Sequence, residues 1–187
     1  MPLTFHTADV KFSLKQKRKL KEFIARQAKQ SNNQTVKLSF IFCSDNYLLN
    51  INKKFLHHDY YTDIITFPPS EDKKHIEAEI YISVERVRDN AEKFKEQNSK
   101  NKIQRTKGKR QDIESKEQKA KFLKQKAETE QWFQEELNRV MFHGALHLLG
   151  YKDKTKAQKA EMRKMEDKWL GEFKKQSTKS KKQNIFI

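Results

Sequence analysis

The sequence predicts a single α/β domain in which helices pack on a small mixed sheet. Its 187 residues are enough for one domain with a well-buried core but too few for two comfortable ones. Along the chain, segments with the alternation of strands are interspersed with segments that have helical periodicity, as in α/β folds. Two of the expected strands are close together in the chain, which favours a hairpin within the sheet.

The N-terminal part is expected to form a strand, a helix and a second strand. The first strand lies near residues 3–12. Ser13 and Gln16 then match the spacing of a capping box, so the helix is expected to start there and to end near Gln30. Its apolar residues recur at helical spacing: Leu14, Leu20, Phe23, Ile24 and Ala28. Residues 36–42 alternate between apolar and other side chains, which is typical of a strand with one buried face.

The middle of the chain is expected to contain a short helix, a loop, a hairpin and a longer helix. Ser44 or Asp45 can cap the short helix, which runs through Phe55. The segment 57–61 is rich in histidine and tyrosine, so it is either a loop that presents polar groups near a site or an ordinary surface loop. The expected ranges are 64–67 and 76–83 for the strands of the hairpin and 84–96 for the longer helix.

Two further helices are expected in the C-terminal part. One resumes the core near Glu128 and leads into His143 and His147. Thr155 can cap the last helix, whose methionines and tryptophan are more typical of a core stripe than of ligands.

The chain is strongly basic, and the excess charge is concentrated in two segments. Lys and Arg number 41 against 25 Asp and Glu, and the net charge of +16 favours polyanionic partners such as RNA or an anionic membrane surface. Residues 98–127 contain eleven basic and three acidic residues, and the tail from Lys174 contains five lysines and no acid. We therefore expect a single packed domain at 1–173 and a mobile basic tail at 174–187. A lysine-rich insertion at about 98–128 is either a phosphate-contacting arm or a spacer without a partner.

The sequence argues against a disulfide-bonded, a membrane-spanning or a secreted protein. The single cysteine, Cys43, cannot form an intrachain disulfide and ends an apolar run, so a buried thiol is expected. No apolar stretch approaches the length of a membrane span, and the N-terminus lacks the pattern of a secretory signal. A soluble cytoplasmic protein that does not act at a membrane is expected.

The residues best suited to chemistry are two histidines and a nearby carboxylate. His143 and His147 are four residues apart, so on a helix both imidazoles project from one face and can reach one ion. Gly150 offers a helix stop, after which Asp153 could fold back toward them. Such a set suits a catalytic Zn²⁺ with an open position. Gly144 stands where zinc peptidases have a glutamate base, so peptide hydrolysis is not expected.

The alternative for the histidines is that they are ordinary polar residues on a half-exposed helix face. The stripe that contains Phe133, Leu137 and Leu148 already supplies a core face, and the two histidines lie beside it rather than within it. A cleft at the edge of the core is therefore the expected location, with the metal site at the end of a core helix.

Three blocks of the sequence resemble one known family. Residues 143–151 match the pattern H-G-x-L-H-L-x-G-Y-D-H up to its tyrosine, and Lys152 and Asp153 replace its last two residues. Residues 62–68 (TDIITFP) resemble a T-D-V-L-S-F-P strand, and residues 79–83 (EIYIS) resemble a D-I-x-I-S strand. These are the signatures of the YbeY family of bacterial endoribonucleases, which are metal-dependent proteins of ribosomal RNA maturation.

The resemblance implies both a cofactor and a substrate. One Zn²⁺ per chain, or another divalent transition metal, would be held by His143, His147 and, by position, Asp153. The implied activity is single-strand endoribonuclease cleavage in ribosomal RNA maturation and ribosome assembly. A metal-bound water would hydrolyse the phosphodiester, or the ribose 2′-hydroxyl would be activated instead. The expected partners are ribosomal RNA or ribosomal particles rather than DNA.

One family residue associated with RNA has no counterpart in this chain. Leu56 occupies the position of the family's arginine upstream of the second block. The role of that arginine in RNA binding is therefore not carried over to this chain, and no catalytic residue is assigned. His57, His58, Lys53 and Lys54 are candidates for positive charge or proton transfer, and solvated surface side chains are the alternative for each. The alternative function is therefore a non-catalytic RNA-binding ribosome assembly factor with a structural metal.

Overall fold

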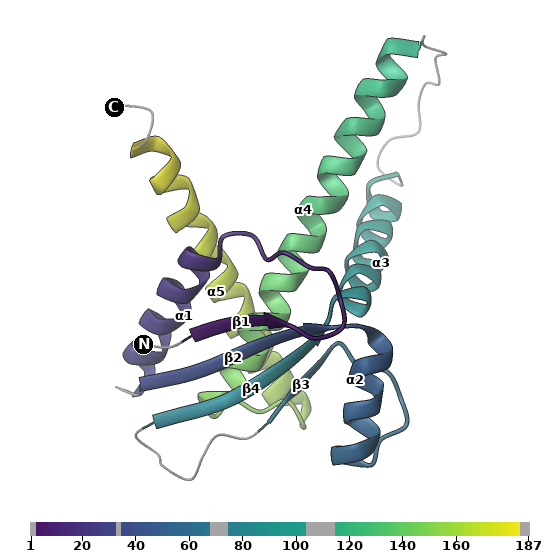
Figure 1. Cartoon of the computed structure of the whole chain (residues 1–187). Coiled ribbons are helices and arrows are strands. Elements are labelled where there is room, and N and C mark those ends of the chain that lie inside the picture. Colours follow the sequence, from purple (N-terminus) through teal and green to yellow (C-terminus); the bar gives the residue numbers. More distant parts are fainter. Residues whose placement is uncertain (1–2, 33–34, 68–74, 104–114, 184–187) are drawn as a thin grey trace.

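A four-stranded mixed sheet lies at the centre of the fold and confirms the expected fold class. The computed structural model describes residues 3–32, 35–67, 75–103 and 115–183. The strands are β1 (Leu3–Thr7), β2 (Thr35–Cys43), β3 (Ile64–Thr66) and β4 (His75–Ser83), in the order β1-β2-β4-β3 (Figure 1). β2 is parallel to both β1 and β4, whereas the edge strand β3 is antiparallel to β4. The expected pairing of the two adjacent strands is therefore correct.

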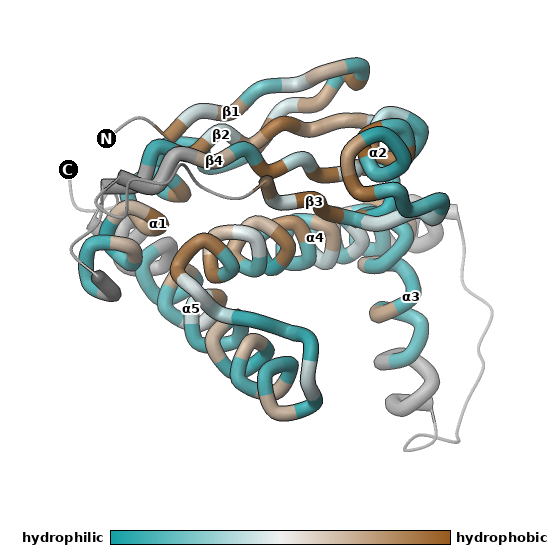
Figure 2. The backbone as a smooth tube through the Cα atoms, turned by 90° about the horizontal axis from the view of Figure 1, so that it is seen from below, coloured by the Kyte–Doolittle hydropathy of each residue, from teal (hydrophilic) through white to brown (hydrophobic). Residues whose placement is uncertain are grey.

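The helices pack mainly on one face of this sheet. They are α1 (Lys17–Asn32), α2 (Asp45–Ile51), the π-helical turn η1 (Asn52–Leu56), α3 (Val84–Ile103), α4 (Ser115–Leu148) and α5 (Lys156–Gln183). Figure 2 shows α4 running along one face of the sheet, with α5 on the far side of α4 and α2 at the end of the sheet next to β3. No helix within the described ranges is both long enough and apolar enough to cross a lipid bilayer.

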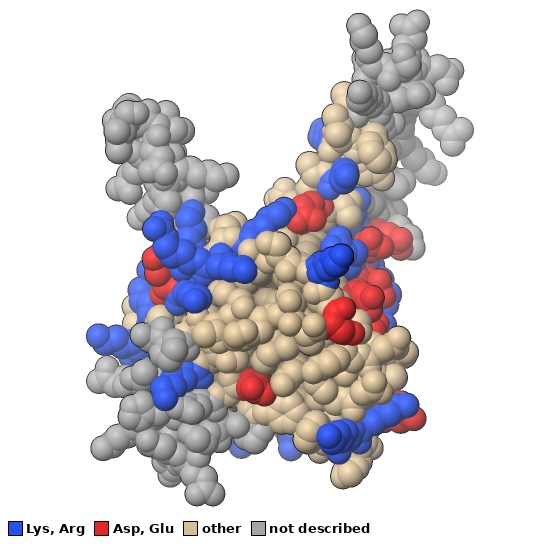
Figure 3. Space-filling view, viewed as in Figure 1, with Lys and Arg blue, Asp and Glu red and all other residues tan. Residues whose placement is uncertain are grey.

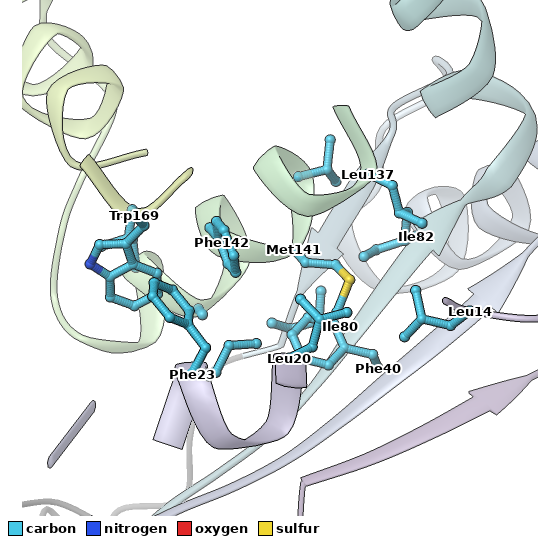
Figure 4. Close-up of a cluster of buried hydrophobic side chains, with 14 of the residues drawn as sticks. Leu14, Leu20, Phe23, Phe40, Ile80, Ile82, Leu137, Met141, Phe142 and Trp169 are labelled. Carbon is cyan, nitrogen blue, oxygen red and sulfur yellow. The ribbon is translucent and has the colours of Figure 1, made fainter. Parts of the chain in front are cut away.

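The main core lies between the sheet and the helices α1, α4 and α5 (Figure 4). Because side chains alternate along a strand, Ile80 and Ile82 point into this core while Tyr81 faces the opposite side. The ring of Phe142 on α4 packs 5.2 Å from that of Phe23 on α1 and 5.6 Å from that of Trp169 on α5, measured between centroids. These contacts hold α4 rigidly, so groups on its adjacent face have fixed positions.

A second, smaller cluster lies on the opposite face of the sheet. Cys43, Leu48 and Ile65 are buried there, and Ile51, Phe67 and Tyr81 pack against them. Ser44 caps α2 as expected, because its Oγ accepts the N–H of Tyr47 at 3.1 Å. The cluster fixes α2 and η1 beside β3, and it confirms that the thiol of Cys43 is buried.

The start of α1 differs from the expectation. β1 ends at Thr7 rather than near residue 12, and α1 begins at Lys17, so the capping box expected at Ser13 is wrong. Gln16 precedes the helix with a φ of 57°, in the left-handed region. This conformation prevents a continuous helix from Ser13, because consecutive helical residues need negative φ.

The basic segments are helical where the structure describes them. α3 ends at Ile103 and α4 starts at Ser115, so both ends of the expected insertion are helical, and residues 104–114 lie outside the described part. α5 extends to Gln183, which includes most of the expected tail, and residues 184–187 also lie outside. Figure 1 shows α4 extending well beyond the sheet. The boundaries of the domain, insertion and tail stay predictions.

Candidate metal centre

The last two turns of α4 place the two histidines beside the core. Leu146 and Phe142 on this part of the helix are fully buried, whereas His143 and His147 are only partly buried on the adjacent face. Their rings are one turn apart, with centroids separated by 4.5 Å. The histidines therefore lie at the edge of the core, as the spacing of the apolar residues predicted.

Gly144 allows α4 to approach the sheet next to the first histidine. A β-carbon at this position would lie 2.8 Å from Cδ1 of Ile64 and 2.9 Å from Cδ1 of Ile80. These separations are well below van der Waals contact, so any side chain would push α4 or the isoleucines away. The glycine keeps His143 close to β3, and the close packing leaves no room for a glutamate.

The end of α4 directs the chain back toward the histidines. Gly150 has a φ of +95°, which favours glycine, and its N–H donates to the carbonyl of His147 at 3.0 Å. The N–H of Tyr151 donates to the carbonyl of Leu146 at 3.1 Å. Together these bonds form a Schellman motif, which ends the helix and reverses the chain. The expected helix stop at Gly150 is confirmed, and the reversal brings Asp153 next to both rings.

The three expected ligands meet at one point. The Nε2 atoms of His143 and His147 are 2.9 Å apart, and each is 3.9 Å from Oδ2 of Asp153. One ligand atom from each residue lies within 4.8 Å of the other two, so the trio could hold a metal ion. Atoms bound about 2.1 Å from a tetrahedral ion are roughly 3.4 Å apart, which falls between the measured separations.

The remaining ring nitrogens of the histidines are held by other groups. Nδ1 of His143 lies 2.8 Å from Oε1 of Glu166, and Nδ1 of His147 lies 2.9 Å from the carbonyl oxygen of Tyr151. Such partners orient the rings and leave the Nε2 atoms free for an ion. The donor set of this chain therefore fits a metal in both identity and orientation.

Glu166 on α5 is a functional candidate that was missed in the sequence. It is 5% exposed and also accepts a hydrogen bond from Arg139 at 3.1 Å. Burial alone would raise the pKa of Glu166, but its hydrogen bonds to His143 and Arg139 lower it. The sequence did contain a signal for Glu166. It lies four residues after buried Met162 and three before buried Trp169, so an acid interrupts the apolar stripe of the helix there.

The pKa of His143 reflects the same contact. Burial alone would lower this pKa, but the hydrogen bond to Glu166 and the charge of that carboxylate raise it above the ordinary value. The charges of Asp153 and Asp63 act in the same direction. The shift therefore arises from carboxylates on three different parts of the chain.

An open cavity of about 580 Å³ lies in front of the three ligands. Its volume lies in the range of roughly 300–1,000 Å³ that is usual for small-ligand pockets. The wall combines the histidines and Asp153 with β3 and with the segment that follows α2. The lining residues from these other elements are Asn52, Leu56, His58, Tyr60, Thr62, Asp63, Ile64, Ile65, Thr66 and Leu148.

The four candidates for charge or proton transfer do not all reach this cavity. His58 lines it, whereas Lys53 pairs with Asp59 at 2.8 Å and Lys54 lies over the ring of Phe55. His57 has a φ of 58° at the end of η1 and is not part of the lining among the described residues. The loop 57–61 therefore does present groups at the site, but through His58 rather than His57.

A known protein family accounts for nearly the whole sequence. The sequence model described as "Endoribonuclease YbeY" matches residues 3–105 and 118–174. The chain belongs to the endoribonuclease YbeY family. The unmatched residues 106–117 fall within the expected lysine-rich insertion. Membership of the YbeY family supports an RNA-cleaving hydrolase.

Individual relatives agree with this assignment. A protein named endoribonuclease YbeY from Cytophaga hutchinsonii is 39% identical over 163 residues, which are 87% of this chain and 90% of the relative. Another from Amoebophilus asiaticus is 38% identical over 166 residues, or 89% of each chain. The solution structure of a Thermotoga maritima protein aligns with a TM-score of 0.51 at 22% identity and covers 93% of both chains. This last likeness supports the fold.

Proposed function

We propose that this YbeY-family protein is a zinc-dependent endoribonuclease that hydrolyses single-stranded ribosomal RNA during its maturation. One observation carries the proposal. The Nε2 atoms of two histidines and an oxygen of Asp153 converge at one point of an open cavity, while the Nδ1 atoms are already hydrogen-bonded. A three-ligand set with an open side is typical of catalytic zinc.

The residues of the chain have separate roles in this proposal. When bound, the ion supplies Lewis-acid activation of water and stabilisation of charge on phosphoryl oxygens. His143, His147 and Asp153 hold it, and Glu166 and the carbonyl of Tyr151 fix the orientation of the rings. The three residues line the cavity, where the RNA strand is expected to bind.

The cationic groups available in the described cavity wall are few. Among the described residues no Lys or Arg lines the cavity, and the apolar Leu56 lines it where the family has an arginine. In this proposal the ion would supply positive charge next to the scissile phosphate. His58 is the candidate that remains for proton transfer, since it is the member of the set Lys53, Lys54, His57 and His58 that lines the cavity.

Contacts with the rest of the RNA are assigned to basic residues outside the cavity. Figure 3 shows few charged side chains over the middle of the face that it presents, and Lys and Arg gather around the edges. The net charge of +16 favours binding to a polyanion without base specificity. Ribosomal RNA is the proposed polyanion because the family signature implies it.

The test compares ligand variants with a matched histidine control. We expect about one zinc per chain in the wild-type protein by elemental analysis and a marked loss in Asp153→Ala. Cleavage of labelled single-stranded RNA should fall at least about 100-fold in His147→Ala. His6→Ala should behave as the wild type, because His6 is exposed on β1 and does not line the cavity. Equal cleavage by His147→Ala and the wild type would contradict the proposed site.

The second candidate function is a non-catalytic RNA-binding ribosome assembly factor with a structural metal. It is favoured by Leu56 and by the lack of cationic side chains in the described cavity wall. In that case the wild-type protein would bind ribosomal particles equally well with and without a chelator, and it would leave single-stranded RNA uncut in the presence of zinc.

A further inference from the structure

Two aromatic rings stack on each other in the wall of the cavity that the histidines of α4 also line. The rings of His58 and Tyr60 have centroids 5.1 Å apart and planes inclined by 22°. A hydrogen bond of 3.1 Å joins the hydroxyl of Tyr60 to Nδ1 of His58. Both side chains line the cavity, yet Tyr60 remains 58% exposed. The ring of Tyr60 is therefore accessible from the cavity and does not pack in the hydrophobic core.

The loop that bears these rings is held by a buried side chain. Asn52 is 2% exposed, and its Nδ2 donates to the carbonyl of Tyr60 at 2.9 Å. The backbone carbonyl of Asn52 accepts the N–H of His58 at 3.3 Å. His57, with a left-handed φ of 58°, turns the chain just before the first of these contacts along the chain. Because the backbone is fixed on both sides of the pair, the rings need little ordering when a ligand binds.

Other parts of the wall suit a nucleobase rather than a phosphate. Leu56 is 43% exposed and offers apolar surface in the same cavity. A base has apolar faces that stack on aromatic rings and pack against apolar side chains of this kind.

We infer that Tyr60 and His58 form a stacking subsite for an unpaired nucleobase of the RNA strand whose phosphodiester lies at His143, His147 and Asp153. The inference rests on the proposed function and names a subsite within it. A base in a duplex is already stacked and paired, so a subsite of this kind selects single-stranded RNA. Since any base has a π face, the subsite is expected to tolerate all four bases.

The test measures binding separately from cleavage. A short single-stranded RNA with one 2-aminopurine in place of an adenine is titrated with protein in the presence of a chelator, so that no strand is cut. We expect the fluorescence of the analogue to be quenched when it stacks on Tyr60. Tyr60→Leu keeps apolar bulk but removes the ring, and it should weaken binding by about 5- to 150-fold and remove the quenching.

Two matched variants make the result specific. Tyr60→Phe keeps the ring but loses the hydroxyl, so both binding and quenching should stay within about twofold of the wild type. Tyr61→Leu removes the neighbouring tyrosine, which is 49% exposed and faces Arg86 at 4.9 Å rather than the cavity, and it should also bind normally. Circular dichroism of each variant separates loss of the ring from loss of the fold.

The outcomes separate this inference from the proposed function. Unchanged binding and quenching in a folded Tyr60→Leu would overturn the stacking subsite even if the wild type cleaves RNA. RNA that binds with quenching but is not cut by the zinc-loaded wild type would overturn the proposed activity and support the subsite. Failure of the wild type to bind single-stranded RNA would overturn the subsite directly.

Discussion

At the scale of single residues, Glu166 connects the packing of α5 with the chemistry of α4. It is buried against His143 and Arg139, and it holds the ring nitrogen that does not face the ligand cluster. An anionic partner of this kind makes a histidine a better ligand and fixes its orientation. We therefore propose that Glu166 positions His143 and does not touch the RNA.

We predict that Glu166→Gln weakens zinc binding by about 10- to 100-fold while the fold is retained, because the amide keeps the volume but not the charge. Competition with a chromophoric chelator measures this affinity. Glu161→Gln is the control, since Glu161 is an exposed residue of the same helix. Equal zinc affinity of the wild type and both variants would show that Glu166 acts only in packing.

The thiol of Cys43 provides a second prediction at this scale. Burial, together with the nearby charges of Asp9 and Asp45, raises the pKa of Cys43 from 9.0 to about 12, and Sγ donates to the carbonyl of Ile82 at 3.6 Å. At pH 8 we expect no alkylation of the folded protein by iodoacetamide and ready alkylation in denaturant, measured by mass spectrometry. Rapid modification of the folded chain at this pH would contradict the prediction.

The same shift has a defined effect on stability. A thiol with a raised pKa stays protonated in the folded chain after it has ionised in the unfolded chain. The folded state then binds more protons, so the free energy of unfolding falls as pH rises. The loss begins above pH 9, the ordinary pKa of the thiol, and continues to about pH 12.

At the scale of elements, the packing of α4 on the sheet determines where the histidines lie. Gly144 faces Ile64 and Ile80 at distances that a β-carbon could not occupy without displacement. Ile80 is fully buried and has little room to move. The glycine is therefore needed for close approach of helix and sheet.

We predict that Gly144→Ala lowers the free energy of unfolding by about 1–2 kcal/mol, because overpacking outweighs the better helix propensity of alanine. Gly171→Ala is the matched control in α5, where a β-carbon would meet nothing within 4 Å. That change should raise the free energy of unfolding by about 0.5–1 kcal/mol. Denaturant titrations give both values, and a stabilising effect at both positions would refute the proposed close approach.

At the scale of the whole molecule, the candidate metal site and the basic charge are separate features. The ligands and their partners lie on α4, α5 and the turn between them, whereas much of the charge surplus falls within residues 98–127 and 174–187. The charge should control affinity for RNA, while the ligands should control cleavage. Changes to one feature are expected to leave the other intact.

We predict that replacing three lysines of the tail by glutamine weakens RNA binding and reduces the salt dependence of affinity, by about 0.7 in log–log slope for each phosphate that the variant no longer neutralises. The zinc content should not change. The substitutions are Lys179→Gln, Lys181→Gln and Lys182→Gln. The control variant carries glutamine at Lys11, Lys17 and Lys21, which are exposed residues at or near α1. Identical salt slopes for the two variants would show that the tail has no special role.

The sequence alone predicted most of the elements and the convergence of the three candidate ligands. Helical spacing put His143 and His147 on one face, Gly150 predicted the turn that returns Asp153, and alternation predicted the strands of the sheet. These features depend on residues a few positions apart, so local periodicity and backbone conformation suffice to predict them. The misplaced start of α1 shows the limit, because Gln16 adopts a left-handed conformation that its residue type does not require.

Only the tertiary structure decided which distant groups surround those ligands. The contact of Glu166 with His143 and the steric need for Gly144 beside Ile80 join separate parts of the chain. The lining of one cavity by Tyr60, His58 and the histidines of α4 likewise depends on how η1 and α2 pack beside β3. These contacts follow from the packing of helices on the sheet. The periodicity of one segment does not indicate which other segment will pack against it.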